Sequence, residues 1–184
     1  MIVTTWKAEM PHLIERIADT VRIAFGSFSL LDVDGPSRSP DALDPEKLYS
    51  LTDENAIWFV ATPNMAIVRS RAGYHHTARI TLELWDAEAP AEDGPEAEMR
   101  TVEFSSSSGR LRSVSHHGDV GPLLDLRVPG ASWLVRGHRI VKPDSFAGDL
   151  DAEDIEDEDE DAEGALEGLE EFLFQFWPVN ACQP

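Results

Sequence analysis

The run that most constrains the fold is "EFLFQFWP" (171–178), the last long apolar stretch of the chain. It places Phe172, Phe174 and Phe176 on one side of an extended backbone, and such a period of two predicts a β-strand with a buried face. Residues 149–171, which lead into this run, contain 14 acidic residues and no lysine or arginine. The strand is therefore reached through a segment of like charges that repel one another.

A segment with this much charge cannot be buried, so we expect it to lie at the surface of the fold as a loop. We expect 147–169 to form a disordered acidic loop, inserted before the C-terminal strand and anchored by that strand at its far end. Lengthening a surface loop costs little, because the entropy of closure grows only logarithmically with loop length. The centre of the acidic charge is Asp157, Glu158, Asp159, Glu160 and Asp161.

Further short apolar runs follow at a spacing of about 8–12 residues, which is typical of β-sandwiches and barrels. The clearest, 78–86, alternates Ile80, Leu82 and Leu84 with polar neighbours. The other candidate strands are 20–32 with Gly26 as a bulge, 55–62, 65–71, 100–105, 108–115, 123–130 and 132–141. We predict one all-β domain over 1–184, an antiparallel β-sandwich of about seven or eight strands with a long acidic loop before the last strand.

Helical features are confined to the first third of the chain. Asp44 can cap a short helix near Pro45–Leu51, with Pro45 in its first turn. Apolar residues nearer the N-terminus also recur at helical spacing, although the run 20–32 that overlaps them fits a strand better. These residues are Leu13, Ile14, Ile17, Ala18 and Val21.

Composition indicates a soluble protein, and the cysteine content fits either a reducing compartment or a secreted protein without disulfides. A hydrophobic fraction of 42% is enough for a core. The single cysteine, Cys182, cannot form an internal disulfide. The N-terminal sequence lacks the pattern of a signal peptide, and no stretch reaches the ~20 apolar residues that cross a bilayer. We expect a cytoplasmic protein with no membrane contact.

The net charge of −20 is concentrated in one segment. Outside 149–171 the chain carries 21 acidic residues against 15 basic ones, which is an ordinary balance. Direct binding to nucleic acid is disfavoured, because phosphate contacts need clustered lysine and arginine. The charge favours a basic protein partner, or serves solubility alone.

The six histidines include two adjacent pairs, His75-His76 and His116-His117. Neighbouring residues on a strand point to opposite faces, so a metal site would need rings from different pairs, with His138 or Asp119 as further ligands. No zinc-binding spacing supports such a site, and whether the pairs bind metal stays open. Surface histidines are the simpler interpretation, and we expect no cofactor.

No catalytic or ligand-binding motif is present. The acidic segment lacks the loop glycine and terminal glutamate of an EF-hand calcium site. "SSSSGR" (105–110) lacks the G-x-S-x-G context of a nucleophilic serine, so we interpret it as a polar hairpin turn. No phosphate-cradling glycine motif occurs either. We expect a protein that is not an enzyme.

Tryptophans offer the remaining candidate contacts. Trp58, Trp85, Trp133 and Trp177 stand within strand runs and are expected in the core. Trp6 stands beside Lys7 in a polar opening segment, so we expect it at the surface. An exposed tryptophan is a suitable anchor for a protein partner.

The order of these segments resembles a known family. "FGSFSLLDVDG", "AIWFVATPNMAIVRSR", "ARITLELWD", "GRLRS", "LDLRVPGASWLVRGH" and "EFLFQFWP" follow one another through residues 20–178. This is similar to the competence protein J-like family of small bacterial β-sandwiches. It looks most like the actinobacterial members, which share a proline-glycine turn before the penultimate strand and a last strand ending in Trp-Pro.

The resemblance implies a role in inhibition. Members of that family are implicated as inhibitors of a DNA-entry nuclease, and similar proteins look like immunity partners of secreted toxins. No functional residue carries over, because the family has no binding motif that can be mapped onto this chain. The acidic segment departs from the family pattern in its length.

Three hypotheses follow. The first is a non-enzymatic acidic protein that binds and neutralises a basic partner such as a nuclease or toxin, through the acidic centre and Trp6. The second is a structural or solubilising module of a larger bacterial assembly. The third is a sandwich that binds a sugar or small ligand through tryptophan or histidine at its rim. The sequence leaves the partner and the oligomeric state open.

Overall fold

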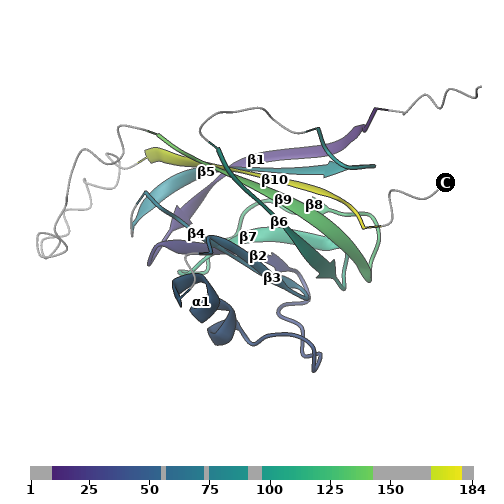
Figure 1. Ribbon diagram of the computed structural model, residues 1–184, viewed down its shortest axis with the longest axis horizontal. Helices are drawn as coiled ribbons and strands as arrows, with labels where there is room; N and C mark the ends of the chain where they lie inside the picture. The colour runs from purple at the N-terminus through teal and green to yellow at the C-terminus, as the bar shows by residue number, and fades with distance from the viewer. Residues whose placement is uncertain (1–9, 55–56, 73–74, 91–96, 143–166, 180–184) are drawn as a thin grey trace, which may run out of the picture.

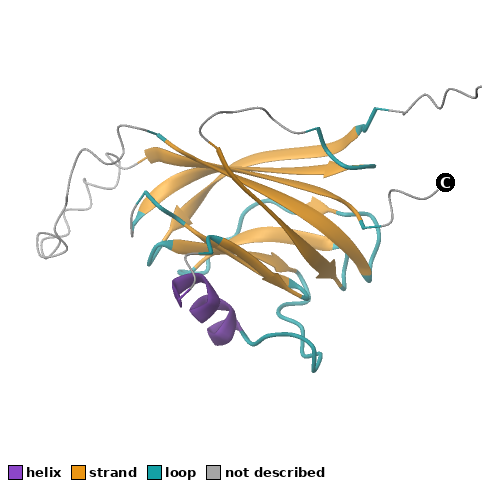
Figure 2. Ribbon diagram, in the orientation of Figure 1, coloured by secondary structure: helices purple, strands orange, loops and turns teal. Residues whose placement is uncertain are grey.

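The computed structural model describes residues 10–54, 57–72, 75–90, 97–142 and 167–179 (Figure 1). Within these residues, ten strands form two five-stranded sheets, and one helix accompanies them (Figure 2). The elements in chain order are β1 (Leu13–Ile23), β2 (Ser27–Asp32), α1 (Pro45–Glu54), β3 (Phe59–Thr62), β4 (Met65–Arg69), β5 (His76–Trp85), β6 (Ala97–Ser106), β7 (Arg110–Ser115), β8 (Leu124–Asp125), β9 (Ala131–Val141) and β10 (Glu167–Pro178). The all-β prediction is confirmed.

The first sheet has the strand order β1-β5-β10-β9-β6, and the second sheet has the order β3-β4-β2-β7-β8. All pairs are antiparallel except β5 with β10, which run parallel. The expectation of a wholly antiparallel fold was therefore wrong for this pair. Strand β10 lies between β5 and β9, which run in opposite directions. A strand between two such neighbours can be antiparallel to only one of them, and for β10 that neighbour is β9.

The buried core lies where the two sheets face each other. Phe172, Phe174 and Phe176 of β10 are buried, as the alternation predicted. Phe28 of the second sheet lies with its ring centroid 5.1 Å from that of Phe172, and Phe59 lies 5.1 Å from Phe174. Aromatic pairs at this spacing contribute beyond the area that they bury.

Gly137 of β9 shows how closely the sheets approach. A Cβ at this position would lie 2.9 Å from Trp58 Cη2 and 3.0 Å from Phe59 Cδ1. Such distances are shorter than carbon atoms tolerate, so the strand needs glycine here.

A second, smaller core lies on the outer side of the second sheet, where α1 packs. Leu48 of α1 is fully buried against Val60, Met65 and Ile67. The predicted cap is present, because Lys47 N donates to Asp44 Oδ1 over 2.9 Å. This hydrogen bond lowers the pKa of the Asp44 carboxyl. The helix predicted near Pro45–Leu51 is confirmed.

The N-terminal segment differs from the sequence interpretation. The residues at helical spacing form strand β1, paired with β5 from Leu13 to Ile23. The run 20–32 is not one strand, because the chain turns at Phe25 and Gly26 and passes from the first sheet to the second. Gly26 thus belongs to a turn between sheets and not to a bulge.

Two other expectations were wrong in detail. Of the predicted strand 123–130, only Leu124–Asp125 pairs as β8, because Arg127 has a φ of 70° and breaks the extended backbone. The polar turn 105–110 joins β6 to β7, which lie in different sheets, so it is not a hairpin. There, Ser106 Oγ donates to the buried Asp32.

Most tryptophans lie where they were expected. Trp58, Trp133 and Trp177 are buried, and Trp85 is half-buried with its Nε1 donating to Glu83. Trp6 lies outside the described residues. No helix within the described ranges is long and apolar enough to span a membrane.

Candidate interaction surface

The residues predicted to bind a partner lie outside the described part of the chain. This applies to Asp157, Glu158, Asp159, Glu160, Asp161 and Trp6, and to residues 147–166 of the expected loop. The last three residues of that loop, 167–169, belong to strand β10, so the strand begins earlier than expected.

Strands β9 and β10, which flank residues 143–166, meet at one end of the first sheet (Figure 1). Val141 pairs with Glu170, and Lys142 N donates to Leu169 O over 3.0 Å. The turn at Phe25 lies at the same end, since Ile23 pairs with His76 and Thr77 pairs with Glu167. We call this the Phe25 end.

The turn itself has an unusual backbone. Phe25 and Gly26 have φ values of 54° and 70°, and Ser27 N donates to Ala24 O over 3.3 Å. Two central residues with positive φ favour asparagine or glycine, and a bulky side chain there is strained. Phe25 is also 54% exposed. Burial of the Phe25 side chain therefore contributes little to stability, while its left-handed backbone conformation costs free energy. A residue that does not favour folding points to a role in binding.

Three histidine rings surround Phe25. The centroid of the Phe25 ring lies 5.4 Å from that of His75, 5.8 Å from that of His116 and 6.1 Å from that of His117. His75 comes from one segment of the chain and the adjacent His116 and His117 from another, and they form an aromatic patch with Phe25 at its centre. Exposed aromatic side chains of this kind are frequent anchors at protein interfaces.

His116 is the best fixed of these rings. Its Nε2 lies 3.0 Å from Ser27 Oγ, and its centroid lies 5.2 Å from that of Tyr49. Partial burial lowers the pKa of His116, and the charges of His117 and Arg69 lower it further. The His116 ring is thus neutral at pH 7, which suits an aromatic contact surface.

We expect Phe25→Gly to leave a more stable protein than Phe25→Ala. Both variants lose the ring, but only alanine keeps a Cβ in the left-handed region, which costs about 1–2 kcal/mol. Chemical denaturation of the two variants measures the difference. Equal free energies of unfolding would show that the turn is not strained.

His76, the sequence neighbour of His75, contacts a buried carboxylate. Glu170 of β10 is fully buried and accepts hydrogen bonds from Ser70 Oγ at 2.5 Å and from Arg71 N at 3.1 Å. His76 Nε2 lies 3.6 Å from its Oε2, and Arg139 Nε lies 3.8 Å from its Oε1. Glu170 therefore ties the start of β10 to the end of β4.

A second carboxylate joins two of the neighbouring arginines. Glu98 Oε1 accepts from Arg71 Nη1, and Glu98 Oε2 accepts from Arg139 Nη2, both over 2.6 Å. Partial burial opposes ionisation of Glu98, but the hydrogen bonds and charges of Arg139 and Arg71 outweigh it and lower its pKa. The two guanidinium groups are thereby held in fixed positions.

His76 is buried and His75 is exposed, as expected of neighbours at a strand, whereas His116 and His117 are both exposed in the turn that follows β7. Rings from the two pairs do meet, but around Phe25. Asp119 instead accepts from Ser115 Oγ, and His138 contacts Gln175. Among the described residues, no group of three or more histidine, cysteine or acidic side chains is placed to hold a metal ion.

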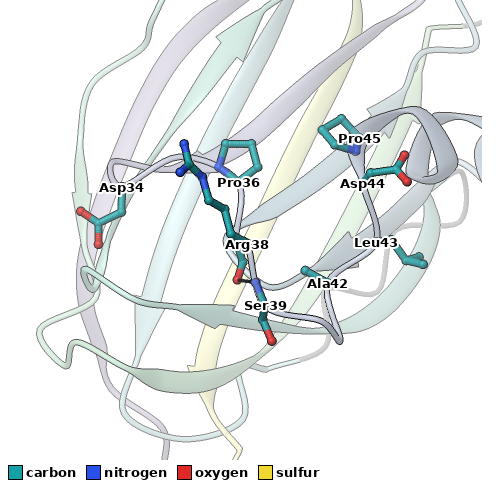
Figure 3. A pocket seen from close by; sticks show the side chains of 9 residues that line it. Asp34, Pro36, Arg38, Ser39, Ala42, Leu43, Asp44 and Pro45 are labelled. Carbon is teal, nitrogen blue, oxygen red and sulfur yellow. Dashed lines mark hydrogen bonds between the residues drawn. The ribbon is translucent and has the colours of Figure 1, made fainter.

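A surface hollow of about 480 Å³ lies on the loop between β2 and α1 (Figure 3). That loop leaves the opposite end of β2 from Phe25. The hollow is lined by Asp34, Pro36, Ser37, Arg38, Ser39, Ala42, Leu43, Asp44 and Pro45. This lining contains no tryptophan or histidine, so the hollow is not the rim site of the third hypothesis.

Comparison with known proteins gives a likeness in fold. The crystal structure of ComJ, inhibitor of the DNA degrading activity of NucA, from Bacillus subtilis superposes with a TM-score of 0.53 over 93% of this chain and 100% of ComJ. The fold is ComJ-like. The identity to ComJ is 12%. The predicted resemblance to the competence protein J-like fold is therefore confirmed.

A second solved structure, that of crocagin biosynthetic gene J, superposes on this chain with a TM-score of 0.51 and 15% identity, over 90% of this chain and 98% of that one. No protein-family model matches the chain, and no curated protein matches it in sequence.

Sequence reasoning missed both Phe25 and the arginines around Glu98 and Glu170. The pair Phe25-Gly26 lies inside an apolar run that predicts a strand with a bulge at Gly26. The residues around this pair include none of the asparagine, aspartate or proline residues that usually mark a turn, so the glycine is the strongest turn-favouring residue there. Arg71 and Arg139 are 68 residues apart in the sequence, and only the packing of the two sheets brings them together.

Proposed function

We propose that this chain is a non-enzymatic cytoplasmic protein that binds and neutralises a protein partner, a nuclease or a similar basic toxin. The observation that carries this proposal is the ComJ-like fold over nearly the whole chain, because ComJ is an inhibitor of a DNA-degrading enzyme. In this proposal the two sheets and their shared core form a single rigid β-sandwich that presents the binding elements.

Charge supplies the second support. Nucleases hold phosphates with positive surfaces, and a concentration of negative charge steers association with such a surface. The acidic segment carries 14 of the 35 acidic residues of the chain. Its flanking strands meet at the Phe25 end, so the charge and the aromatic patch are tethered to the same end of the protein.

The partner can be identified by capture on the immobilised full chain from an extract of the source cells. The captured protein is then purified, and its DNA-degrading activity is measured with and without the chain. Loss of that activity at equimolar chain supports the proposal. A captured partner with no nuclease or toxin activity would instead favour a structural module of a larger assembly.

Neutralising the acidic centre should slow association with that partner about tenfold or more at low salt. The variant replaces Asp157, Asp159 and Asp161 with Asn, and Glu158 and Glu160 with Ser. Its association rate should also depend less on salt concentration. Stopped-flow mixing at several salt concentrations measures both.

The matched control removes five acidic charges elsewhere on the surface. It replaces Asp41, Glu46, Asp86, Glu88 and Glu103, which are all exposed. If the acidic centre acts in binding, this control associates faster than the first variant. Equal rates for wild-type protein and the first variant would show that the acidic centre plays no part.

A further inference from the structure

The turn that carries Phe25 is held firmly by the strands around it. Ser70, which follows β4, donates from its backbone N to Gly26 O over 2.9 Å. The hydroxyl of the same Ser70 donates to Glu170 in β10. A strained backbone persists only where the surrounding structure over-determines it, and these contacts supply that restraint.

The phenyl ring is supported as well as the backbone. The rings of Phe25 and His116 meet edge to face, with their planes at 90°. His116 in turn lies against Tyr49 of α1, which packs on the smaller core. Contacts from the turn to the helix therefore position the ring, and a positioned side chain loses little entropy when it binds.

The exposure of Phe25 sets it apart from the other aromatic residues. Among the residues that the structure describes, no other phenylalanine, tyrosine or tryptophan is exposed. Large aromatic side chains contribute most to stability when they are buried, and Phe25 forgoes most of that contribution. Fixed, exposed aromatic side chains are the type of residue that carries most of the binding energy at protein interfaces.

The position of the patch indicates which partner it fits. The strands that flank the acidic segment meet at the Phe25 end, so a basic protein attracted by that charge arrives beside Phe25. Long-range charge acts mainly on the association rate, whereas contacts buried within an interface act mainly on the dissociation rate. The two features therefore suit successive stages of one binding event.

We propose that Phe25 is the anchor of the partner interface, and that its ring enters an apolar pocket on the basic partner. This inference rests on the proposed function for the identity of that partner. It gives the two features separate tasks. The acidic segment raises the association rate, and Phe25 sets the dissociation rate.

The test compares the wild-type full chain with Phe25→Gly and Phe25→Asn, using the partner captured from the source cells. Glycine and asparagine both suit a backbone with positive φ, so these variants keep the turn and remove the ring. We expect the partner to dissociate about tenfold faster or more from both variants, with little change in the association rate. Surface plasmon resonance measures the two rates.

Two control variants separate the ring from other effects. Phe25→Tyr keeps an aromatic ring and should dissociate at a rate close to that of wild-type protein. Val128→Ala removes another exposed apolar side chain, from the loop after β8. β8 pairs with the start of β7, at the other end of that strand from His116, so this variant should also behave as wild type.

The outcomes distinguish this inference from the proposed function. Equal dissociation rates for wild-type protein and the two folded ring-deletion variants would overturn the anchor, even if the partner is an inhibited nuclease. Such rates would assign Phe25 a purely structural role. Faster dissociation of a partner without nuclease or toxin activity would support the anchor and contradict the proposed function. If the wild-type chain retains no protein, both are overturned.

Discussion

Glu170→Ala is expected to destabilise the protein by about 3 kcal/mol or more, which corresponds to roughly 6–12 °C in Tm for a chain of this size. The carboxylate is fully buried and accepts hydrogen bonds from Ser70 Oγ and Arg71 N. Alanine leaves the partly buried Ser70 Oγ and Arg71 N without this acceptor, and it removes one of the two carboxylates that balance Arg139. Urea denaturation followed by circular dichroism measures the loss.

Glu171→Ala is the matched control, since it deletes the same side chain one residue later. Glu171 is half-buried and lies 3.6 Å from Arg79 and 3.7 Å from Lys142, and the side chains of Arg79 and Lys142 are exposed. Surface ion pairs of this kind contribute about 0–1 kcal/mol. Similar losses for the two variants would mean that Glu170 does not anchor β10.

The parts of the fold that could be predicted are those in which local pattern and burial agree. In β10, the three phenylalanines of the alternating run all face the core. In β5, Ile80, Leu82 and Leu84 do the same. The helix α1 was marked by Asp44 and Pro45, because capping depends on residues adjacent in sequence.

Strand β1 was not evident, because its pattern is mixed. The residues that face the core alternate as Ile17, Asp19, Val21 and Ile23, and the aspartate interrupts the apolar row. Apolar residues on the opposite face, such as Ile14 and Ala18, then produce an accidental helical spacing. Pairing with β5 along the whole strand decides its conformation, and such tertiary pairing is not visible locally.

The site was harder to predict than the fold, because it depends on contacts between distant segments. Arg71 and Glu98 share an ion pair across 27 residues, and Ser70 and Glu170 share a hydrogen bond across 100. The Ser70–Glu170 contact depends on the placement of β10 beside β5, which sequence pattern did not indicate. The charge of the acidic segment was plain in the sequence, whereas the network that joins Arg71 and Arg139 to Glu98 and Glu170 was not.

The central position of β10 explains why the acidic segment is tolerated where it is. β10 pairs with β5 on one side and with β9 on the other, so its attachment does not depend on the segment that precedes it. Two ladders of backbone hydrogen bonds and three buried phenylalanines offset the entropy of closing the connection from β9. The strand that follows the acidic segment is thus among the best anchored in the protein.

Phe174→Ala tests this anchoring and should cost about 3–5 kcal/mol. Phe174 is fully buried at the centre of the first sheet, with its ring centroid 5.1 Å from Phe59, 6.2 Å from Phe172 and 6.3 Å from Phe28. Alanine leaves a cavity where rings from both sheets meet, and backbone pairing on either side prevents the strand from collapsing into it. Calorimetry or denaturant unfolding measures the loss.

Leu173→Ala is the control for Phe174→Ala, because the neighbouring side chain points to the outer face of the same strand and is only half-buried. It should cost about 1 kcal/mol, since a half-buried side chain loses less apolar area and leaves no enclosed cavity. A difference of 2 kcal/mol or more between the two variants supports the assignment of the two faces. Equal losses would mean that the phenylalanine face of β10 does not form the core, and the anchoring of the acidic segment would then need another explanation.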